Sequence, residues 1–314
     1  MAVQHQPRIA VLLPCFNEEA TIAATVAGFR SALPSATVYV YDNNSRDRTR
    51  EIAVAGGAVV RSERQQGKGH VVRRMFADID ADVYVMADGD LTYDPGSAQA
   101  MVDLLLADRL DMVVGTRRHD DKGAYRGGHV LGNRLFTAML GRLFGRSFSD
   151  IFSGYRVFSR RFVKSFPVLS AGFEIETEMS VHALELRMPV GEVETAYGSR
   201  PEGSQSKLST FGDGWRILKT IATLYRTERP VLFFGSIGAL LLVAAMVLAV
   251  PLIATYLDTG LVPRVPTAIL ITGMTIVAVL CFFAGLILDT VTRGRREVRR
   301  LAYLSHDAPD SDRV

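Results

Sequence analysis

The chain has 314 residues, which is too long for one minimal core and short for three ordinary domains. Its formal net charge of +3 is mild and gives no indication of a nucleic-acid partner. The two cysteines, Cys15 and Cys281, lie far apart in sequence, which excludes a disulfide framework and favours a reducing compartment.

Short apolar runs alternate with helix-like stretches through the first part of the chain. We expect strands at 8–14, 37–41, 58–61, 82–87 and 111–116, and helices at 18–33, 47–57, 67–80 and 95–107. In the first helix, for example, Ile22, Val26 and Phe29 recur at helical spacing. The alternation predicts an α/β fold with a mainly parallel, twisted sheet that helices cover on both faces.

Polar clusters follow four of these strands, at the point where each strand ends. They read PCFNEE, DNNSRD, DGD and GTRR in chain order. Sheets of this kind bind ligands beyond the carboxyl ends of their strands. The coincidence of four clusters at one edge therefore predicts a binding site there, although each cluster alone could be an ordinary polar loop.

The third cluster, Asp88-Gly89-Asp90, ends an apolar run from Val83 to Met86. Carboxylates at a strand end cost desolvation unless something positive meets them, and the candidates are a metal, a basic side chain or plain water. Hard cations such as Mg²⁺ take oxygen ligands and bridge phosphate oxygens, so the pair predicts a site for Mg²⁺ or Mn²⁺. An exposed turn would use the same residue types, so this signal is weak in isolation.

The C-terminal third contains two long uncharged runs, 231–256 and 265–288. Each exceeds the roughly 20 residues that a helix needs to cross the hydrocarbon of a bilayer. The sequences that flank the pair, YRTERP and RGRREVRR, are basic. The positive-inside rule then predicts a multi-pass protein of the inner (cytoplasmic) membrane, with the N-terminal part and both termini on the cytoplasmic side.

Two amphipathic stretches add to the membrane interpretation. Residues 129–148 interleave arginines with apolar residues at helical spacing, and 211–230 carry Trp215 and Tyr225 just before the first span. Ordinary core-facing helices would show similar patterns. We expect four parts: a cytoplasmic catalytic domain (1–210), an interfacial helix (211–230), two transmembrane helices (231–290), and a basic flank with a disordered tail (291–314).

Seven motifs in order resemble family 2 glycosyltransferases with the GT-A fold. The group of closest likeness is the polyprenyl-phosphate sugar synthases, which include dolichol-phosphate mannose synthase and bacterial GtrB-like enzymes. The motifs are LPCFNEE, YDNNSRDRT, ADGDLTYD, GTRR, SDIFSGYRVF, GFEIETEM with VGEVE, and RPEGSQSKL. The likeness covers residues 8–210 and continues into the paired spans.

The resemblance assigns roles to residues of this chain. It implies that the nucleotide sugar, UDP- or GDP-linked, is held by Pro14, Phe16, Glu18, Asp42, Lys68, Asp88, Gly89, Asp90, Arg200 and Lys207. Asp88 and Asp90 would hold the metal. The acceptor phosphate would be contacted by Arg117, Asn133, Arg134, Thr137 and Arg156. Asp88, Asp90 and Arg117 are the expected catalytic residues, and Glu178 matches the acidic-helix position.

The family departs from this chain at two places. Thr92 stands where the family has Gln, which puts a third protein ligand to the metal in doubt. Asn133 and Thr137 stand where the family has an Arg and a Ser, so Arg134 is our substitute for the second phosphate contact. For the arginines, attraction to lipid headgroups without catalysis is the simpler alternative.

The function implied is inverting, metal-dependent transfer of a sugar to a polyprenyl phosphate, undecaprenyl or dolichyl, for a cell-envelope glycan or protein glycosylation. A phosphate acceptor is largely dianionic at neutral pH, so it needs no strong general base. The alternatives are a processive polysaccharide synthase, a nucleotidyltransferase and a non-catalytic nucleotide-binding membrane scaffold. The two spans could also pack into a homo-oligomer.

Overall fold

A computed structural model describes residues 6–118, 141, 148–172, 174–198, 223 and 225–309. The chain divides into two compact units. Unit 1 is Met1–Gly214 with Arg299–Val314, and unit 2 is Trp215–Val298.

In the described residues of unit 1, seven strands form one sheet in the order β3-β2-β1-β4-β6-β5-β7. β6 runs antiparallel to both of its neighbours, and the other pairings are parallel. The parallel strands therefore all end at one edge of the sheet, and β6 begins there. The strands are β1 (Ile9–Cys15), β2 (Thr37–Asp42), β3 (Val59–Ser62), β4 (Val83–Met86), β5 (Met112–Arg118), β6 (Arg156–Ser159) and β7 (Val190–Ala196).

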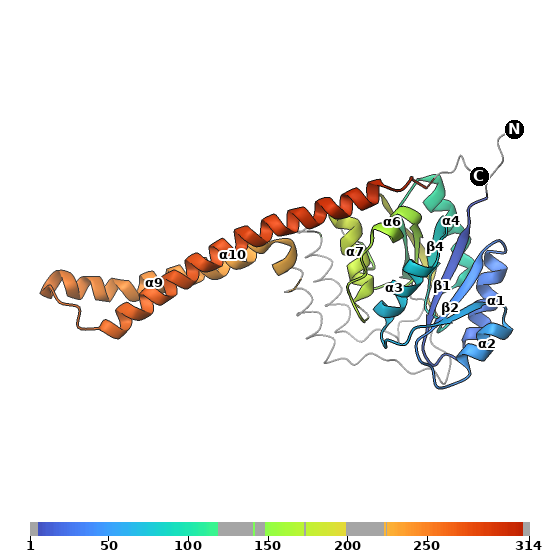
Figure 1. The fold of residues 1–314 in the computed structure, drawn as a ribbon, viewed down its shortest axis with the longest axis horizontal. Helices are drawn as coiled ribbons and strands as arrows, with labels where there is room; N and C mark the ends of the chain where they lie inside the picture. The colour runs from blue at the N-terminus through green and yellow to red at the C-terminus, as the bar shows by residue number, and fades with distance from the viewer. Residues whose placement is uncertain are drawn as a thin grey trace. The chain divides into compact units, whose positions relative to one another are not determined.

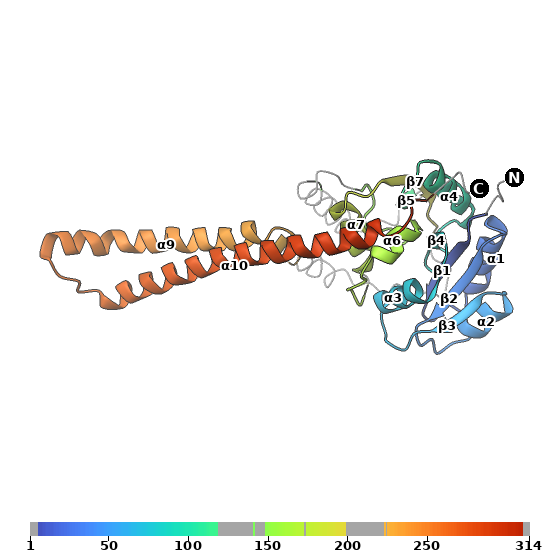
Figure 2. The same ribbon diagram turned by 45° about the horizontal axis from the view of Figure 1, so that its top comes forward.

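Helices cover both faces of this sheet (Figure 1, Figure 2). Alternate strand residues point to opposite faces, so Val11 and Leu13 join Phe29 and Met101 in one core on the first face. α1 (Ile22–Ala32), α2 (Thr49–Ala55) and α4 (Ala98–Ala107), which follows a short 3₁₀ turn at Pro95–Ser97, cover that face. α3 (Lys68–Asp78), α6 (Arg160–Ser165) and α7 (Ile175–Glu185) cover the other.

Aromatic rings fill the second face. Phe158 stacks on Phe162 with ring centroids 4.7 Å apart, and Phe162 and Phe166 both contact the imidazole of His182 on α7. His182 is buried, its Nε2 lies 3.2 Å from the Ser165 hydroxyl, and its Nδ1 has no hydrogen-bond partner in the described part of the chain. Burial and the charge of Arg299 lower the pKa of His182 to about 3, so this side chain is neutral at physiological pH.

These observations confirm the expected α/β class, and the expected elements match β1 to β5 and α1 to α4 within a few residues. The sequence patterns did not anticipate β6. It is four residues long and buried on both faces, so it carries neither the alternation of a half-exposed strand nor a signal of its direction.

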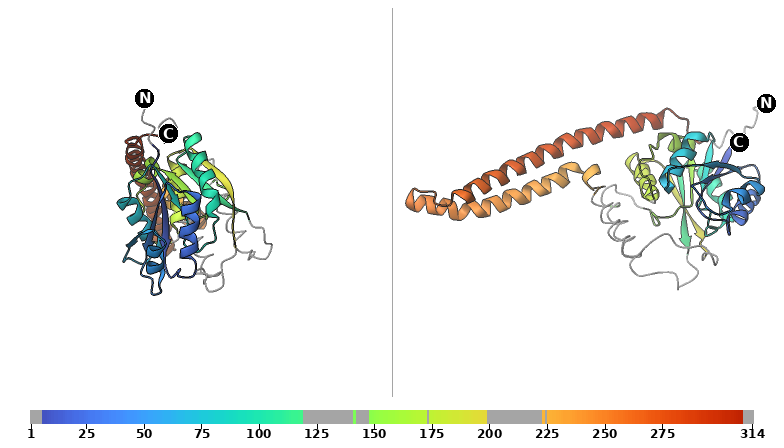
Figure 3. Two further views of the ribbon diagram at one scale, coloured as in Figure 1. Left: turned by 90° about the vertical axis from the view of Figure 1, so that its right-hand side faces the viewer. Right: turned by 60° about the horizontal axis from the view of Figure 1, so that its bottom comes forward.

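The described residues of unit 2 include two long helices, α9 (Pro230–Thr259) and most of α10 (Val265–Leu304). Both are long enough, and each contains a stretch apolar enough, to cross a membrane. They lie side by side (Figure 3). A Cβ atom at Gly238 of α9 would lie 2.9 Å from the carbonyl oxygen of Ala278, so glycine permits this close packing.

The last turn of α10, from Arg299 onwards, belongs to unit 1. Arg299 pairs with Glu185 at 2.5 Å, and Arg300 donates to the Leu186 carbonyl. The hydroxyl of Tyr303 donates to Asp111, a fully buried carboxylate. The end of the predicted basic flank is thus part of the fold of unit 1.

Candidate active site

The loops that follow β1, β2 and β4 are joined to one another at the carboxyl edge of the sheet. The amide of Asn43 donates to the Cys15 carbonyl at 2.9 Å, which ties the ends of β1 and β2 together. The hydroxyl of Thr21 donates to the Gly89 carbonyl at 2.8 Å, which ties the start of α1 to the loop after β4. These hydrogen bonds connect the polar loops along this edge.

The four residues predicted to hold base and ribose lie at this edge. Pro14 and Asp42 come from the last pairs of the β1–β2 register, and Phe16 and Glu18 follow β1 directly. Asp42 is buried, and one of its oxygens accepts from the Ser45 amide at 3.2 Å. The structure thus brings these predicted residues together.

The acidic pair lies where β4 runs out. Gly89 separates the two aspartates, and a Cβ there would lie 2.5 Å from the Cys15 sulfur, so glycine is required at this approach. Asp90 is buried, and its Oδ1 accepts from the Thr92 amide at 3.2 Å and the Thr92 hydroxyl at 2.6 Å. Thr92 therefore orients Asp90, which is a use for the residue at which this chain departs from the family.

Lys68 bridges Asp88 and a carboxylate from another element. Its Nζ lies 2.5 Å from Asp88 Oδ1 and 2.6 Å from Glu176 Oε1 on α7. The side chains of Lys68 and Glu176 are each 7% exposed, whereas that of Asp88 is 30% exposed. Burial alone would lower the pKa of Lys68, but the two carboxylates raise it above its ordinary value, so the ammonium stays charged.

The sequence Gly67-Lys68-Gly69 is explained by backbone packing. A Cβ at Gly67 would lie 2.2 Å from the carbonyl oxygen of Ala171, and one at Gly69 would lie 2.1 Å from that of Ser170. The Gly69 amide donates to the Ala171 carbonyl at 3.1 Å. The two glycines let the start of α3 pack against the segment that leads into α7, which places Lys68 between its two carboxylates.

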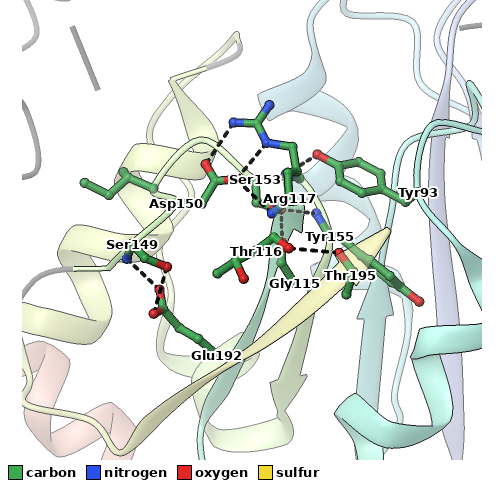
Figure 4. Close-up of polar contacts among 12 residues, drawn as sticks. Tyr93, Gly115, Thr116, Arg117, Ser149, Asp150, Ser153, Tyr155, Glu192 and Thr195 are labelled. Carbon is green, nitrogen blue, oxygen red and sulfur yellow. Dashed lines mark hydrogen bonds and ion pairs between the residues drawn. The ribbon is translucent and has the colours of Figure 1, made fainter. Parts of the chain in front are cut away.

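Arg117, at the end of β5, is held by Asp150 in a bidentate ion pair (Figure 4). Nε donates to Asp150 Oδ2 at 2.7 Å and Nη2 donates to Oδ1 at 2.8 Å. The guanidinium also lies over the ring of Tyr197, 5.4 Å from its centroid. Burial would lower the pKa of Arg117, but the bonds to Asp150 raise it, and the pKa of Asp150 is correspondingly lowered.

Arg156 occupies the interior rather than the site surface. It is fully buried, and its guanidinium donates to the carbonyls of Ser153 and Ile151 and to the hydroxyl of Ser180. Burial lowers its pKa to about 10. Arg156 has no exposed surface, and its N–H groups donate to protein oxygens. This position contradicts the prediction that Arg156 contacts the acceptor phosphate. Arg156 fixes the turn that carries Asp150 instead.

Two acidic residues that pair with basic side chains at this edge are Glu176 and Asp150. Glu176 and Asp150 were not singled out from the sequence. Glu178, the expected acidic-helix residue, accepts from the amides of Leu169 and Ser170, both at 2.8 Å, and caps that segment. The following predictions lie outside the described residues: Asn133, Arg134, Thr137, Arg200, Lys207 and most of the two amphipathic stretches.

The acidic pair fits a divalent cation that arrives with a phosphate ligand. The described residues contain no group of three or more His, Cys, Asp or Glu side chains placed to hold a metal. Mg²⁺ commonly binds one or two carboxylates and completes its shell with substrate phosphates and water. Asp88 and Asp90 supply two such carboxylates, and Thr92 already holds the second in place.

Comparison with known proteins decides the family. A family model described as Glycosyl transferase family 2 matches residues 10–166. Glycosyltransferase AglJ of Haloferax volcanii is 37% identical over 232 residues, which are 73% of this chain and 76% of that protein. The chain belongs to glycosyl transferase family 2.

The chain is also similar to a further relative and to a solved structure. The Dolichyl-phosphate hexose transferase of Haloferax volcanii is 27% identical over 221 residues, which are 70% of this chain and 95% of that protein. A structure of Mycobacterium tuberculosis glucosyl-3-phosphoglycerate synthase with Mn²⁺, UDP-glucose and phosphoglyceric acid is 24% identical, covers 70% of this chain and 79% of that chain, and has a TM-score of 0.57. That likeness shows the fold, and the expected GT-A architecture is confirmed. The chain is a glycosyltransferase.

Proposed function

We propose that this glycosyltransferase moves a hexose from a nucleotide sugar to the phosphate of a polyprenyl lipid, giving a polyprenyl-monophosphate sugar. The observation that carries the proposal is the pairing of two features in one chain. One is an edge that presents Asp88, Asp90 and Arg117 together, and the other is a pair of helices apolar enough to cross a membrane. A relative named for dolichyl-phosphate hexose transfer supports the lipid acceptor.

The donor would bind along the ends of β1, β2 and β4. Pro14, Phe16, Glu18 and Asp42 would surround base and ribose, and Asp88 and Asp90 would hold Mg²⁺ or Mn²⁺. Arg200 and Lys207 would close over the diphosphate. The cation supplies charge neutralisation of the departing nucleoside diphosphate. A fold neighbour solved with Mn²⁺ and UDP-glucose supports this assignment.

The acceptor would bind on the β5 side of the same edge. Asp150 uses two of the five N–H donors of the Arg117 guanidinium, so the same group can also grip a phosphate oxygen. Asn133, Arg134 and Thr137 are proposed as further contacts. A dianionic phosphate attacks without a strong base, so we propose an in-line displacement with inversion at the anomeric carbon.

The membrane arrangement follows from charge. The flanks of the two apolar helices are rich in arginine, and such flanks face the cytoplasm. We propose that residues 1–210 and both termini are cytoplasmic, that 211–230 lie at the interface, and that 231–290 span the membrane ahead of the basic flank 291–314.

The test mixes the full chain in detergent with Mn²⁺ or Mg²⁺, short polyprenyl phosphate and a panel of UDP- and GDP-sugars. We expect a lipid-monophosphate sugar and free nucleoside diphosphate by mass spectrometry. Asp90→Asn should abolish the product, while Asp103→Asn on the exposed face of α4 should not. Release of pyrophosphate, or transfer to water-soluble phosphates in place of the lipid, would contradict the proposal.

A further inference from the structure

Lys68 forms an ion pair with Asp88, a carboxylate that the proposed donor complex also uses to bind the metal. Its ammonium contacts Asp88 Oδ1 at 2.5 Å, and Asp88 is one of the two proposed metal ligands. A divalent cation and an ammonium on one carboxylate repel each other, and the repulsion is strong where water is largely excluded. The Lys68 side chain is 7% exposed, so solvent does little to screen it.

Glu176 offers the ammonium a second carboxylate without a large movement. Its Oε1 is already 2.6 Å from Lys68 Nζ, and its side chain is as buried as that of the lysine. Glu176 lies in the first turn of α7 and so belongs to a different element from Asp88, which lies in the loop after β4. Lys68 can therefore give up Asp88 and remain paired.

Gly154 lies beside both Asp88 and Lys68. A Cβ at Gly154 would lie 3.0 Å from Asp88 Oδ2 and 3.2 Å from Lys68 Nζ, so a larger residue would crowd both groups. The Gly154 amide donates to the Tyr93 hydroxyl at 2.8 Å, which fixes this glycine in place. The absence of a side chain at Gly154 therefore leaves room for the Lys68–Asp88 ion pair.

We propose that Lys68 is an internal counter-ion that neutralises Asp88 in the empty enzyme and shifts to Glu176 when the cation binds. The proposal rests on the metal site of the proposed function and deepens it. Asp88, Asp90 and Glu176 with one ammonium carry a formal net charge of −2, and the buried Arg156 guanidinium adds one positive charge near Glu176. Lys68 and Glu176 thereby act as positioning residues that set the affinity for the metal.

The test measures Mn²⁺ affinity of the full chain in detergent, without nucleotide, by electron paramagnetic resonance of the free ion. Lys68→Met removes the competing cation and should tighten Mn²⁺ binding about tenfold, whereas Glu176→Gln removes the second carboxylate and should weaken it about tenfold. In the Lys68→Met background, Glu176→Gln should weaken binding by less than about threefold, because no ammonium is left to relocate. Asp103→Asn, on the exposed face of α4, also changes a carboxylate to a carboxamide and is the control that should leave the affinity unchanged.

The outcomes separate this inference from the proposed metal site. Wild-type binding that disappears in Asp90→Asn supports the metal site, and binding independent of Asp90 would overturn both proposals. Two results would overturn the counter-ion exchange alone while Mn²⁺ binding still depends on Asp90. The first is weaker Mn²⁺ binding in both Lys68→Met and Glu176→Gln. The second is an equal loss of Mn²⁺ affinity from Glu176→Gln in the wild-type and Lys68→Met backgrounds. Circular dichroism and thermal midpoints establish that each variant is folded. If Lys68→Met does not fold, the comparison of Glu176→Gln with Asp103→Asn decides. Equal Mn²⁺ affinities in these two variants would overturn the exchange.

Discussion

Replacement of Asp150 by asparagine tests whether Arg117 must be held in one orientation to bind the acceptor. The carboxylate accepts from Nε at 2.7 Å and from Nη2 at 2.8 Å, with side chains 11% exposed for Asp150 and 22% for Arg117. Asparagine is nearly the same size and keeps one acceptor oxygen. The substitution thus removes about one charge-assisted hydrogen bond and the negative charge, with little change in volume.

Two effects of this substitution oppose each other. Hydrogen bonds to charged groups contribute about 1.5–3 kcal/mol each, so loss of one loosens the Arg117 guanidinium by roughly 2 kcal/mol. Loss of the negative charge would instead strengthen the attraction between Arg117 and a phosphate, but water reaches the partly exposed guanidinium and screens that term. We therefore expect the loss of orientation to dominate, and about 2 kcal/mol corresponds to a roughly 30-fold fall in kcat/KM for the acceptor.

The assay is steady-state transfer at varied polyprenyl phosphate, with the donor dissociation constant measured separately. We expect kcat/KM for the acceptor to fall by about 30-fold and donor affinity to change less than about twofold. Ser149→Ala is the control, because Ser149 precedes Asp150 but bonds to Glu192 and not to Arg117. Tighter acceptor binding in Asp150→Asn, or equal losses for donor and acceptor, would refute the positioning role.

Two further predictions concern stability. Because the folded-state pKa of His182 is lowered to about 3, the stability that depends on its neutral form is complete above its unfolded pKa of about 6.5 and is lost as pH falls toward 3. The opening free energy of α7, from hydrogen exchange corrected for pH, should fall by about 2 kcal/mol between pH 6.5 and 5 in the wild type and stay flat in His182→Gln. Gly69→Ala should reduce the free energy of unfolding by about 1–3 kcal/mol and lower the thermal midpoint, because the added Cβ would lie 2.1 Å from the Ser170 carbonyl oxygen. Gly198→Ala is the control and should leave the midpoint unchanged, because its Cβ would lie 4.0 Å from the nearest atom, the Thr92 carbonyl oxygen.

The order of elements was predictable because helical and strand periodicities are local. Ile22, Val26 and Phe29 all proved buried on the inner side of α1, as their spacing predicts. The direction of β6 was not predictable, because pairing with β4 and β5 depends on contacts between distant segments. The gathering of the polar loops at one edge of the sheet was predictable from the parallel direction of the strands that precede them.

The site was predicted in part for similar reasons. Motif positions predicted that Asp88, Asp90 and Arg117 lie at the carboxyl edge of the sheet, and the structure places them there. A motif does not say which face of a helix packs against a given basic side chain. Glu176 shares a face of α7 with buried Ser180, four residues later, and that spacing was the available signal for a buried carboxylate in need of a partner. Arg156 is the first residue of β6, a fully buried strand that the sequence patterns did not anticipate, so its interior position was not predictable from them.

The central claim is that Asp88 and Asp90 hold a divalent cation together with the diphosphate of a sugar donor. The most direct measurement is a crystal or cryo-EM structure of the full chain with Mn²⁺ and a nucleotide sugar, with anomalous scattering to locate manganese where crystals allow. The account predicts a manganese peak about 2.1 Å from an oxygen of each aspartate, in contact with the diphosphate. A nucleotide bound elsewhere, with both carboxylates turned away from any metal, would contradict it.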